Sequence, residues 1–113
     1  MFKPKSAFGR PVELEDCKLS VGPGWQDLIE ECYNLCVKYE VNILQVKEKF
    51  GTLRFYTGAA AKEFHDKISD ICARSANICE SCGDHGELIR IGGWYYTYCG
   101  PCTNKLKKAR GIQ

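Results

Sequence analysis

Cys79-Glu-Ser-Cys82 and Cys99-Gly-Pro-Cys102 are the two segments that decide how the C-terminal part of this 113-residue chain folds. Each segment places two sulfurs on one side of a tight turn, and the sixteen residues between the pairs can form a hairpin that brings the turns together. Two C-x-x-C pairs at this spacing are typical of a structural zinc site, in which four thiolates about 2.3 Å from the ion leave no open position. We therefore predict one structural Zn²⁺ bound by Cys79, Cys82, Cys99 and Cys102.

The residues between and after the two pairs predict the rest of a small metal lobe. Glu87–Ile91 and Trp94–Tyr98 have strand-like patterns and are separated by Gly92-Gly93, a two-residue hairpin signal. Thr103–Arg110 is predicted as a short basic helix, and knuckle, hairpin, knuckle and helix is the order of a treble-clef zinc site. Without that helix the lobe would be a plain zinc ribbon. We expect residues 79–113 to form this Zn(Cys)₄ lobe.

The middle of the chain, residues 23–78, predicts an α+β core. Pro23 suits the first turn of a helix, and the apolar residues that follow it recur at helical spacing. Val41–Val46 and Thr52–Thr57 are typical of two strands joined in a hairpin, and residues 59–77 return to a helical period. Helix, hairpin and helix then form the core of a small α+β protein, with the zinc-ribbon or treble-clef-like lobe at its C-terminal end.

The N-terminal residues 1–22 predict an irregular arm. They contain two of the four prolines, and Lys3, Lys5 and Arg10 make the tip of the arm basic. Apolar residues such as Leu14 could pack or form a short edge strand, but a loosely docked terminus is the interpretation that we favour. We expect the arm, the core and the lobe to form one compact unit.

The composition and the start of the sequence predict a cytoplasmic protein. No apolar run has the length of a transmembrane helix, and the start Met-Phe-Lys-Pro-Lys lacks the apolar core of a signal peptide. Without export, the eight cysteines favour reduced thiols and metal binding. Four thiolates contribute −4 and zinc +2, so the formal net charge of +2 becomes about zero and does not itself predict nucleic-acid binding. We expect no membrane association and no small-molecule substrate.

Other uses of the two cysteine pairs are weaker. Disulfides or an iron–sulfur cluster fit the spacing and the compartment less well than zinc does. A thioredoxin-like role for Cys99-Gly-Pro-Cys102 would leave the matching upstream pair without a function. His85-Gly-Glu87 followed by this pair is similar to the zinc-deaminase signature, but Tyr98 stands where that signature has proline. Two complete ligand pairs also leave no position for a catalytic water.

No other constellation predicts catalysis. A treble-clef nuclease of the His-Asn-His type needs a histidine pair or cluster, and the chain contains only His65 and His85. His65 lies beside the apolar face of a predicted helix, where a surface or boundary histidine is the simpler interpretation. No glycine-rich phosphate loop is present either. We predict that the protein is not an enzyme and has no catalytic residues.

Four cysteines remain outside the predicted zinc site: Cys17, Cys32, Cys36 and Cys72. Cys32 and Cys36 are one helical turn apart and could supply two ligands to a second metal. They also lie on the apolar stripe of their helix, where a reduced cysteine is an ordinary small core residue. We favour core thiols, because no further C-x-x-C knuckle or histidine accompanies them.

Two features of the lobe suggest a binding surface. The first is a tail with no acidic residue after Glu87: Lys105, Lys107, Lys108 and Arg110. The second is one face of the last strand: Trp94, Tyr96 and Tyr98. Cations can neutralise phosphates, and aromatic rings can stack on unpaired bases. Alternatively, the aromatic side chains pack the lobe onto the core and the lysines only solvate a terminal helix.

The chain also resembles a group of small proteins encoded by tailed phages and prophages. The resemblance spans about Gly24 to Cys102 and is carried by four motifs. These are Gly24-Trp25, Gln45-Val-Lys-Glu-Lys-Phe-Gly51 with Leu53-Arg-Phe-Tyr56, Cys79-Glu-Ser-Cys82-Gly83, and Gly93-Trp94 before the last cysteine pair. It implies a bacterial cytoplasm and a phage or prophage gene, but no mechanism. Some members of the group end the site with a histidine, whereas this chain has cysteine at all four positions.

Two functions therefore remain open. The first is a non-enzymatic zinc-binding module that associates with nucleic acid through the basic tail and the aromatic strand. The second is a phage accessory protein that binds and modulates a bacterial protein, such as a polymerase or an anti-phage defence enzyme. The partner is thus predicted to be nucleic acid or a bacterial protein.

Overall fold

The centre of the core is helix α2 (Gln26–Tyr39), which follows a 3₁₀ turn, η1 (Pro23–Trp25), in the computed structural model of residues 1–111. Proline occupies the first turn of η1, as predicted, because its fixed φ suits that position. One stripe of α2 is buried and includes Leu28, Ile29 and Cys36. The helix ends at Glu40, which adopts a left-handed conformation with φ of 55°. The predicted first helix is confirmed.

An antiparallel hairpin follows, formed by β1 (Ile43–Lys49) and β2 (Thr52–Thr57). Leu53 and Phe55 are buried while Tyr56 is exposed, which is the alternation expected of a strand with one face against a core. The hairpin prediction is confirmed, but β1 starts two residues later than expected and extends to Lys49.

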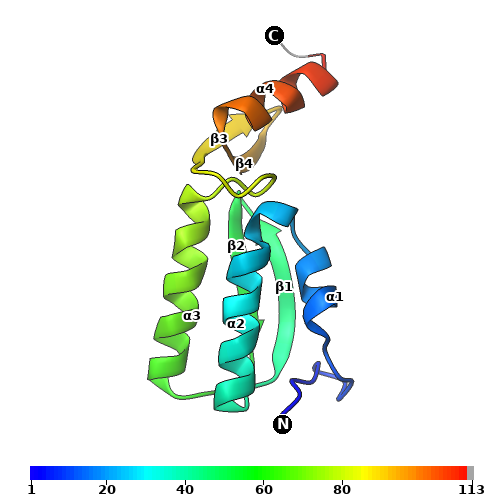
Figure 1. The fold of residues 1–113 in the computed structure, drawn as a ribbon, viewed down its shortest axis with the longest axis vertical. Helices are drawn as coiled ribbons and strands as arrows, with labels where there is room; N and C mark the ends of the chain where they lie inside the picture. The colour runs from blue at the N-terminus through cyan, green and yellow to red at the C-terminus, as the bar shows by residue number, and fades with distance from the viewer. Residues whose placement is uncertain (112–113) are drawn as a thin grey trace.

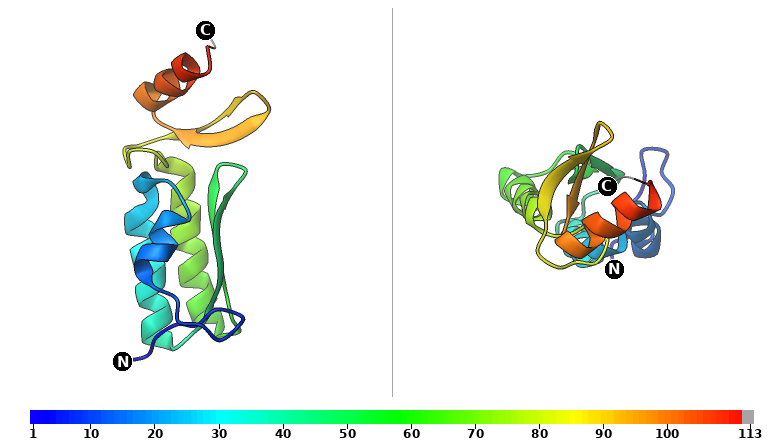
Figure 2. Two further views of the ribbon diagram at one scale, coloured as in Figure 1. Left: turned by 90° about the vertical axis from the view of Figure 1, so that its right-hand side faces the viewer. Right: turned by 90° about the horizontal axis from the view of Figure 1, so that it is seen from above.

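Helix α3 (Lys62–Arg74) and the turn η2 (Ser75–Asn77) complete the core. The helices lie side by side as one layer and the hairpin forms a second layer (Figure 2). Trp25, Ile29, Leu53 and Phe64 are essentially inaccessible to solvent between the two layers. Burial of such large apolar side chains is the main stabilising contribution in a domain of this size.

The N-terminal arm is more ordered than predicted. It contains a short helix, α1 (Leu14–Leu19), where we expected irregular structure, and the buried Cys17 of α1 belongs to the main hydrophobic core. Tyr33 of α2 donates its hydroxyl hydrogen to the carbonyl oxygen of Val12 at 2.8 Å. The carbonyl oxygen of Lys5 accepts a hydrogen bond from the backbone N–H of Ile43. The arm is therefore tied to both layers, through contacts that a local sequence pattern does not reveal.

The C-terminal lobe is stacked on one end of the core, so that the molecule is elongated, with extents of 49 × 25 × 21 Å (Figure 1). A second antiparallel hairpin, β3 (Glu87–Ile91) with β4 (Trp94–Tyr98), precedes helix α4 (Gly100–Ala109). Gly92 and Gly93 both have positive φ in the connecting turn, which glycine adopts at little energetic cost. The predicted hairpin and helix are thus confirmed up to residue 111, and residues 112–113 of the predicted lobe lie outside the described residues.

Hydrogen bonds hold the lobe, and Ile78 directly before it, at the end of the core. The indole N–H of Trp25 donates to the carbonyl oxygen of Ile78 at 2.8 Å, and the backbone N–H of Gly24 donates to the carbonyl oxygen of Glu80 at 2.9 Å. The hydroxyl of the fully buried Thr97 donates to the carbonyl oxygen of Gly51 at 2.6 Å. The lobe is therefore held at the start of the helix layer and at the β1–β2 turn. None of the helices in residues 1–111 combines the length and the apolar character needed to cross a bilayer.

Candidate metal centre

The structure brings the four predicted ligands together. The Sγ atoms of Cys79, Cys82, Cys99 and Cys102 all lie within 4.8 Å of one another, and those of Cys82 and Cys99 are 3.6 Å apart. A tetrahedron with metal–sulfur bonds of about 2.3 Å has sulfur–sulfur edges of about 3.8 Å. Cys79 and Cys102 are buried, whereas Cys82 is exposed at the rim. The donor set and its spacing fit a four-coordinate metal ion.

The first ligand pair lies in a loop whose backbone turns back on itself. The backbone N–H of Cys79 donates to the carbonyl oxygen of Asp84 at 2.7 Å, and that of Gly83 donates to the carbonyl oxygen of Cys79 at 2.9 Å. Gly83 has φ of 88°, where a side chain would be strained. A Cβ atom at Gly86 would lie 2.9 Å from the backbone nitrogen of Cys79. The two glycines therefore allow the tight loop that places Cys79 and Cys82 together.

The second ligand pair lies at the start of α4. Cys99 is the residue that caps this helix, and its carbonyl oxygen accepts hydrogen bonds from both the backbone N–H and the hydroxyl of Thr103, at 2.9 and 2.8 Å. Cys102 follows in the first helical turn. The N-terminal end of a helix carries partial positive charge, which favours thiolates there. The first turn of α4 therefore both contains the second cysteine pair and fixes the direction of the helix.

The pKa values of Cys79 and Cys82 indicate how a cation would change the charge of the cysteine group. Burial opposes ionisation of Cys79, but backbone N–H groups of the two knuckles hold its pKa at about 7, below the ordinary value. A backbone N–H of Asp84 favours the Cys82 thiolate, but hydrogen bonds with the neighbouring thiols, chiefly Cys99, and desolvation outweigh it and raise the pKa of Cys82 to about 12. One thiolate thus forms readily while its neighbours oppose further ionisation. A bound divalent cation would reverse that balance and favour all four thiolates.

The other four cysteines lie in the core, as predicted. Cys17, Cys32 and Cys36 are buried members of the main hydrophobic cluster, and Cys72 is partly buried against it. Burial is the main reason why the pKa values of Cys17 and Cys36 are raised to about 11 and about 12. The Cys17 and Cys36 thiols therefore stay protonated and apolar near neutral pH.

The aromatic strand is oriented differently from one of our expectations. The residue that joins β4 to the core is Thr97, so the side chains of Trp94, Tyr96 and Tyr98 lie on the opposite face of the strand. Tyr96 and Tyr98 have ring centroids 5.1 Å apart, and the Arg110 guanidinium donates to the Tyr96 hydroxyl at 2.7 Å. The interpretation that this aromatic face packs the lobe onto the core is therefore wrong. Tyr96 and Tyr98 lie beside α4 instead, and Trp94, at the start of the strand, is exposed.

The predicted basic residues all belong to α4 or its C-terminal cap. Lys105, Lys108 and Arg110 are exposed, and Lys107 is half-buried. The ion pairs found among residues 1–111 involve other cations, namely Lys3, Lys18, Lys62 and Arg74. The structure thus brings Arg110 together with Tyr96 and leaves the three lysines of α4 without a carboxylate partner in the described part of the chain.

Sequence reasoning missed one residue of this surface, Phe50 of the β1–β2 turn. Phe50 in that turn is exposed and lies against Tyr95 of β4, with ring centroids 6.3 Å apart and the rings nearly perpendicular. The sequence does show an aromatic residue directly before the turn glycine Gly51, which indicates an exposed ring. That Phe50 lies beside the lobe depends on the tertiary arrangement. The surface therefore includes residues of both hairpins.

The fold and the site define a small mixed α+β protein with a four-cysteine group that can hold a metal ion. Comparison with known proteins adds no identification: no family model, no curated protein and no solved structure gives a significant match to this chain.

Proposed function

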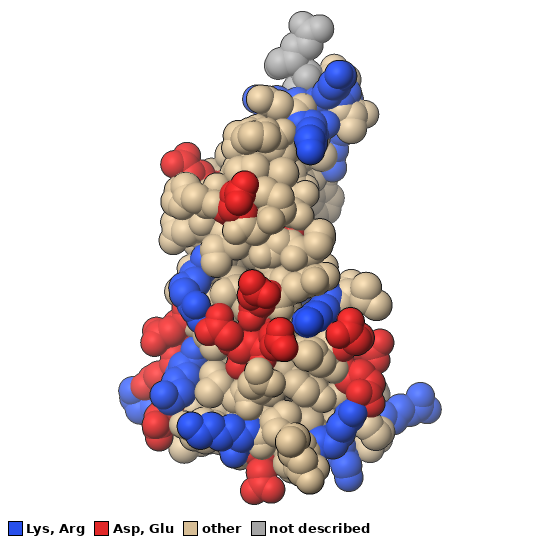
Figure 3. Space-filling model, viewed as in Figure 1, with Lys and Arg blue, Asp and Glu red and all other residues tan. Residues whose placement is uncertain are grey.

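We propose that this chain is a non-enzymatic zinc-binding module that associates with nucleic acid through its C-terminal lobe. The observation that carries the proposal is the set of α4 lysines, which have no ion-pair partner in residues 1–111 and lie on a helix that starts at the metal ligands. Lysines in this state can replace condensed counterions on a phosphate backbone. Figure 3 shows the basic side chains gathered at the lobe end, over α4.

Zinc has a structural role in this proposal. Bound to Cys79, Cys82, Cys99 and Cys102, the ion would join the loop before β3 to the start of α4. The direction of α4 across the aromatic face of β4 then depends on the metal, and so does the Arg110–Tyr96 contact. The ion supplies no open coordination position for chemistry when all four thiolates bind it.

Charge reversal of the α4 lysines tests the proposal. We expect the combined substitutions Lys105→Glu, Lys107→Glu and Lys108→Glu to weaken oligonucleotide binding by at least about tenfold at low salt, and to reduce the salt dependence of binding by about two counterions, because roughly 0.7 counterions are released per neutralised phosphate of a single strand. Fluorescence anisotropy with labelled DNA and RNA, titrated with salt, measures both effects.

The matched control reverses three exposed lysines of the core, Lys38, Lys62 and Lys67. It changes the net charge by the same amount on the core helices instead of α4, so a general electrostatic effect would weaken binding equally in both variants. Equal weakening, or no salt-sensitive binding of the unmodified protein at micromolar concentration, would contradict the proposal.

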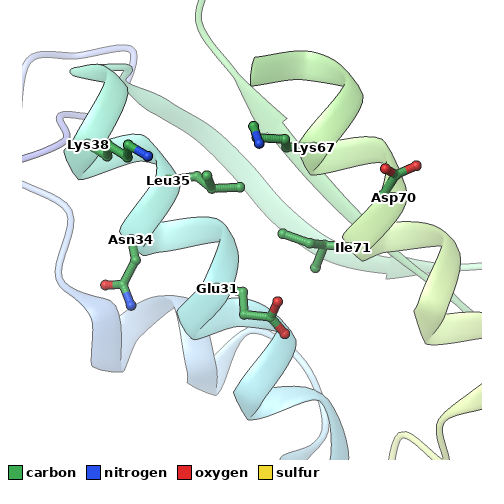
Figure 4. A pocket seen from close by; sticks show the side chains of 7 residues that line it. All are labelled: Glu31, Asn34, Leu35, Lys38, Lys67, Asp70 and Ile71. Carbon is green, nitrogen blue, oxygen red and sulfur yellow. The ribbon is translucent and has the colours of Figure 1, made fainter. Parts of the chain in front are cut away.

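A second candidate function is the binding of a bacterial protein, in the phage setting that the motifs suggest. The observation that favours it is a groove of about 460 Å³ between α2 and α3. Leu35 and Ile71 point toward one another across this groove, and charged side chains such as Glu31 and Lys67 surround them (Figure 4). Figure 3 shows acidic and basic side chains interspersed over the core. If tagged protein retained a stoichiometric bacterial partner, and Leu35→Arg abolished retention without changing oligonucleotide binding, this second function would be supported.

A further inference from the structure

A cleft of about 350 Å³ lies where the turns of the two hairpins meet. One side of it comes from the end of β1 and the β1–β2 turn, and the other side from the β3–β4 turn and the start of β4. The lining residues are Glu48, Lys49, Phe50, Gly93, Trp94 and Tyr95. It lies outside the metal site, and neither the four thiolates nor the lysines of α4 line it.

The cleft carries more exposed aromatic surface than packing of the lobe requires. Trp94 is 68% exposed, Phe50 62% and Tyr95 39%, although rings of this size are normally among the side chains that a small domain buries. Single exposed apolar residues are ordinary, but three aromatic rings grouped around one cavity mark a binding surface. The hydrogen bonds from Thr97 to Gly51 and from Gly24 to Glu80, which join the lobe to the core, involve none of these rings.

Phe50 adopts an unfavourable backbone conformation to reach this position. Its φ is 54°, a region in which a bulky side chain is rarely found and which glycine or asparagine would occupy more easily. The turn is fixed by Glu48, whose carboxylate accepts the backbone N–H of Gly51 at 2.7 Å. Strained residues held by their surroundings concentrate at functional sites. The strain here holds a phenyl ring toward solvent at the entrance of the cleft.

The rim of the cleft is basic. The Lys49 ammonium lies 5.5 Å from the Phe50 ring centroid, and the Arg90 guanidinium lies 5.6 Å from the Tyr95 ring centroid. Neither cation belongs to an ion pair among residues 1–111. The lining carboxylate, Glu48, uses one of its oxygens to hold the turn. Aromatic faces with adjacent unpaired cations are the combination that binds unpaired bases and their phosphates.

The tip of the β3–β4 hairpin, beside the cleft, also lies close to the end of the basic helix. A guanidinium nitrogen of Arg110 lies 3.7 Å from the position that a Cβ atom of Gly92 would occupy, so the end of α4 reaches the tip of the β3–β4 hairpin. A strand with one base in the cleft would therefore pass close to the C-terminal end of α4 as it leaves the hairpin tip.

We infer that this cleft binds an unpaired base of a single-stranded nucleic acid, stacked on Trp94 and Phe50, with Lys49 and Arg90 beside the flanking phosphates. The inference rests on the proposed nucleic-acid function and makes it specific: the ligand is single-stranded, because a base within a duplex does not expose its face. A peptide with an aromatic or apolar anchor is the competing occupant, but the unpaired cations at the rim favour a polyanion.

Intrinsic fluorescence reports directly on the cleft. The chain has two tryptophans, and Trp25 is fully buried, so quenching on addition of an oligonucleotide reports on Trp94. We expect a single-stranded dT₁₅ or rU₁₅ probe to quench this emission while it raises the anisotropy of a label on the probe. A duplex of the same length is expected to bind with little quenching.

Phe50→Gly is the decisive variant because it removes the ring and relieves the backbone strain, and should therefore fold at least as well as the unmodified protein. We expect it to weaken binding of the single-stranded probe by at least about fivefold, since stacking contributes about that much or more per base. Trp94→Leu should weaken binding similarly. Phe8→Gly is the matched control, since Phe8 is 92% exposed and belongs to the N-terminal arm, which begins at the end of the molecule opposite the lobe (Figure 1).

Each other outcome overturns a defined statement. If Phe50→Gly binds dT₁₅ as the unmodified protein does, while reversal of the α4 lysines abolishes binding, the cleft inference is wrong and the proposed function stands. If no probe binds the unmodified protein, both are wrong. If Phe50→Gly keeps oligonucleotide binding but loses a protein that the unmodified chain retains, the cleft is a peptide site and the inference is likewise overturned.

Discussion

Cys99→Ser is expected to release the metal ion and unfold the lobe, while the α+β core stays folded. Serine cannot replace the thiolate in a soft four-sulfur site, and Cys99 both belongs to the four-cysteine group and caps α4. In small zinc-folded peptides the apparent free energy of metal binding is about 10 kcal/mol or more, so loss of the ion removes most of what stabilises such a lobe. The core should survive because its buried cluster, from Cys17 to Ile71, contains no metal ligand.

Native mass spectrometry should show the zinc content falling from one ion per chain to nearly none. Amide resonances of residues 79–111 should lose their dispersion in a ¹H–¹⁵N spectrum, while those of α2 and α3 should keep theirs. Cys72→Ser, which makes the same chemical change beside the core, is the matched control and should retain the metal. A Cys99→Ser protein that still carried one zinc ion would refute the ligand assignment.

The metal site was predictable from the sequence because its determinants are local. A C-x-x-C pair forms its loop almost regardless of the rest of the chain, and Gly92-Gly93 determines the hairpin that brings the two pairs together. The α2 stripe and the alternation in β2 were readable for the same reason, since each is a periodic pattern within one element. These are the parts of the structure that short-range rules control.

What the sequence did not predict depends on contacts between distant segments. Helix α1 forms where only an irregular arm was expected, because Cys17 and Tyr33 bring the arm against α2. The alternation of side chains along β4 divides them between two faces of the strand, but it does not indicate which face meets the core. The cleft beside Phe50 has the same origin, because its two sides come from turns more than forty residues apart in the chain. Short-range patterns therefore identified the four-cysteine group, while tertiary packing formed the surface beside it.

Gly24→Ala is expected to cause the second large effect, by separating the lobe from the core. A Cβ atom at this position would lie 1.9 Å from the carbonyl oxygen of Cys79 and 2.6 Å from the backbone nitrogen of Gly83. Both are backbone atoms of the metal-binding loop, so no side-chain rotation can relieve the clash. The hydrogen bond from Gly24 to Glu80 would be lost as the loop moves away. We expect the free energy of unfolding to fall by about 3 kcal/mol or more, measured by urea denaturation at saturating zinc.

Gly100→Ala is the matched control, because it adds the same methyl group to a glycine of the lobe. At Gly100 nothing lies within 4 Å of an added Cβ atom and the residue belongs to α4, where alanine is the better helix former. Its stability should therefore equal or slightly exceed that of the unmodified protein. Because Gly24 lies in the helix layer and not in the lobe, a large effect of Gly24→Ala alone would mean that the metal-binding loop and the start of α2 fold as one unit. If both variants were equally stable, the close packing of Gly24 against Cys79 would not be what holds the lobe on the core.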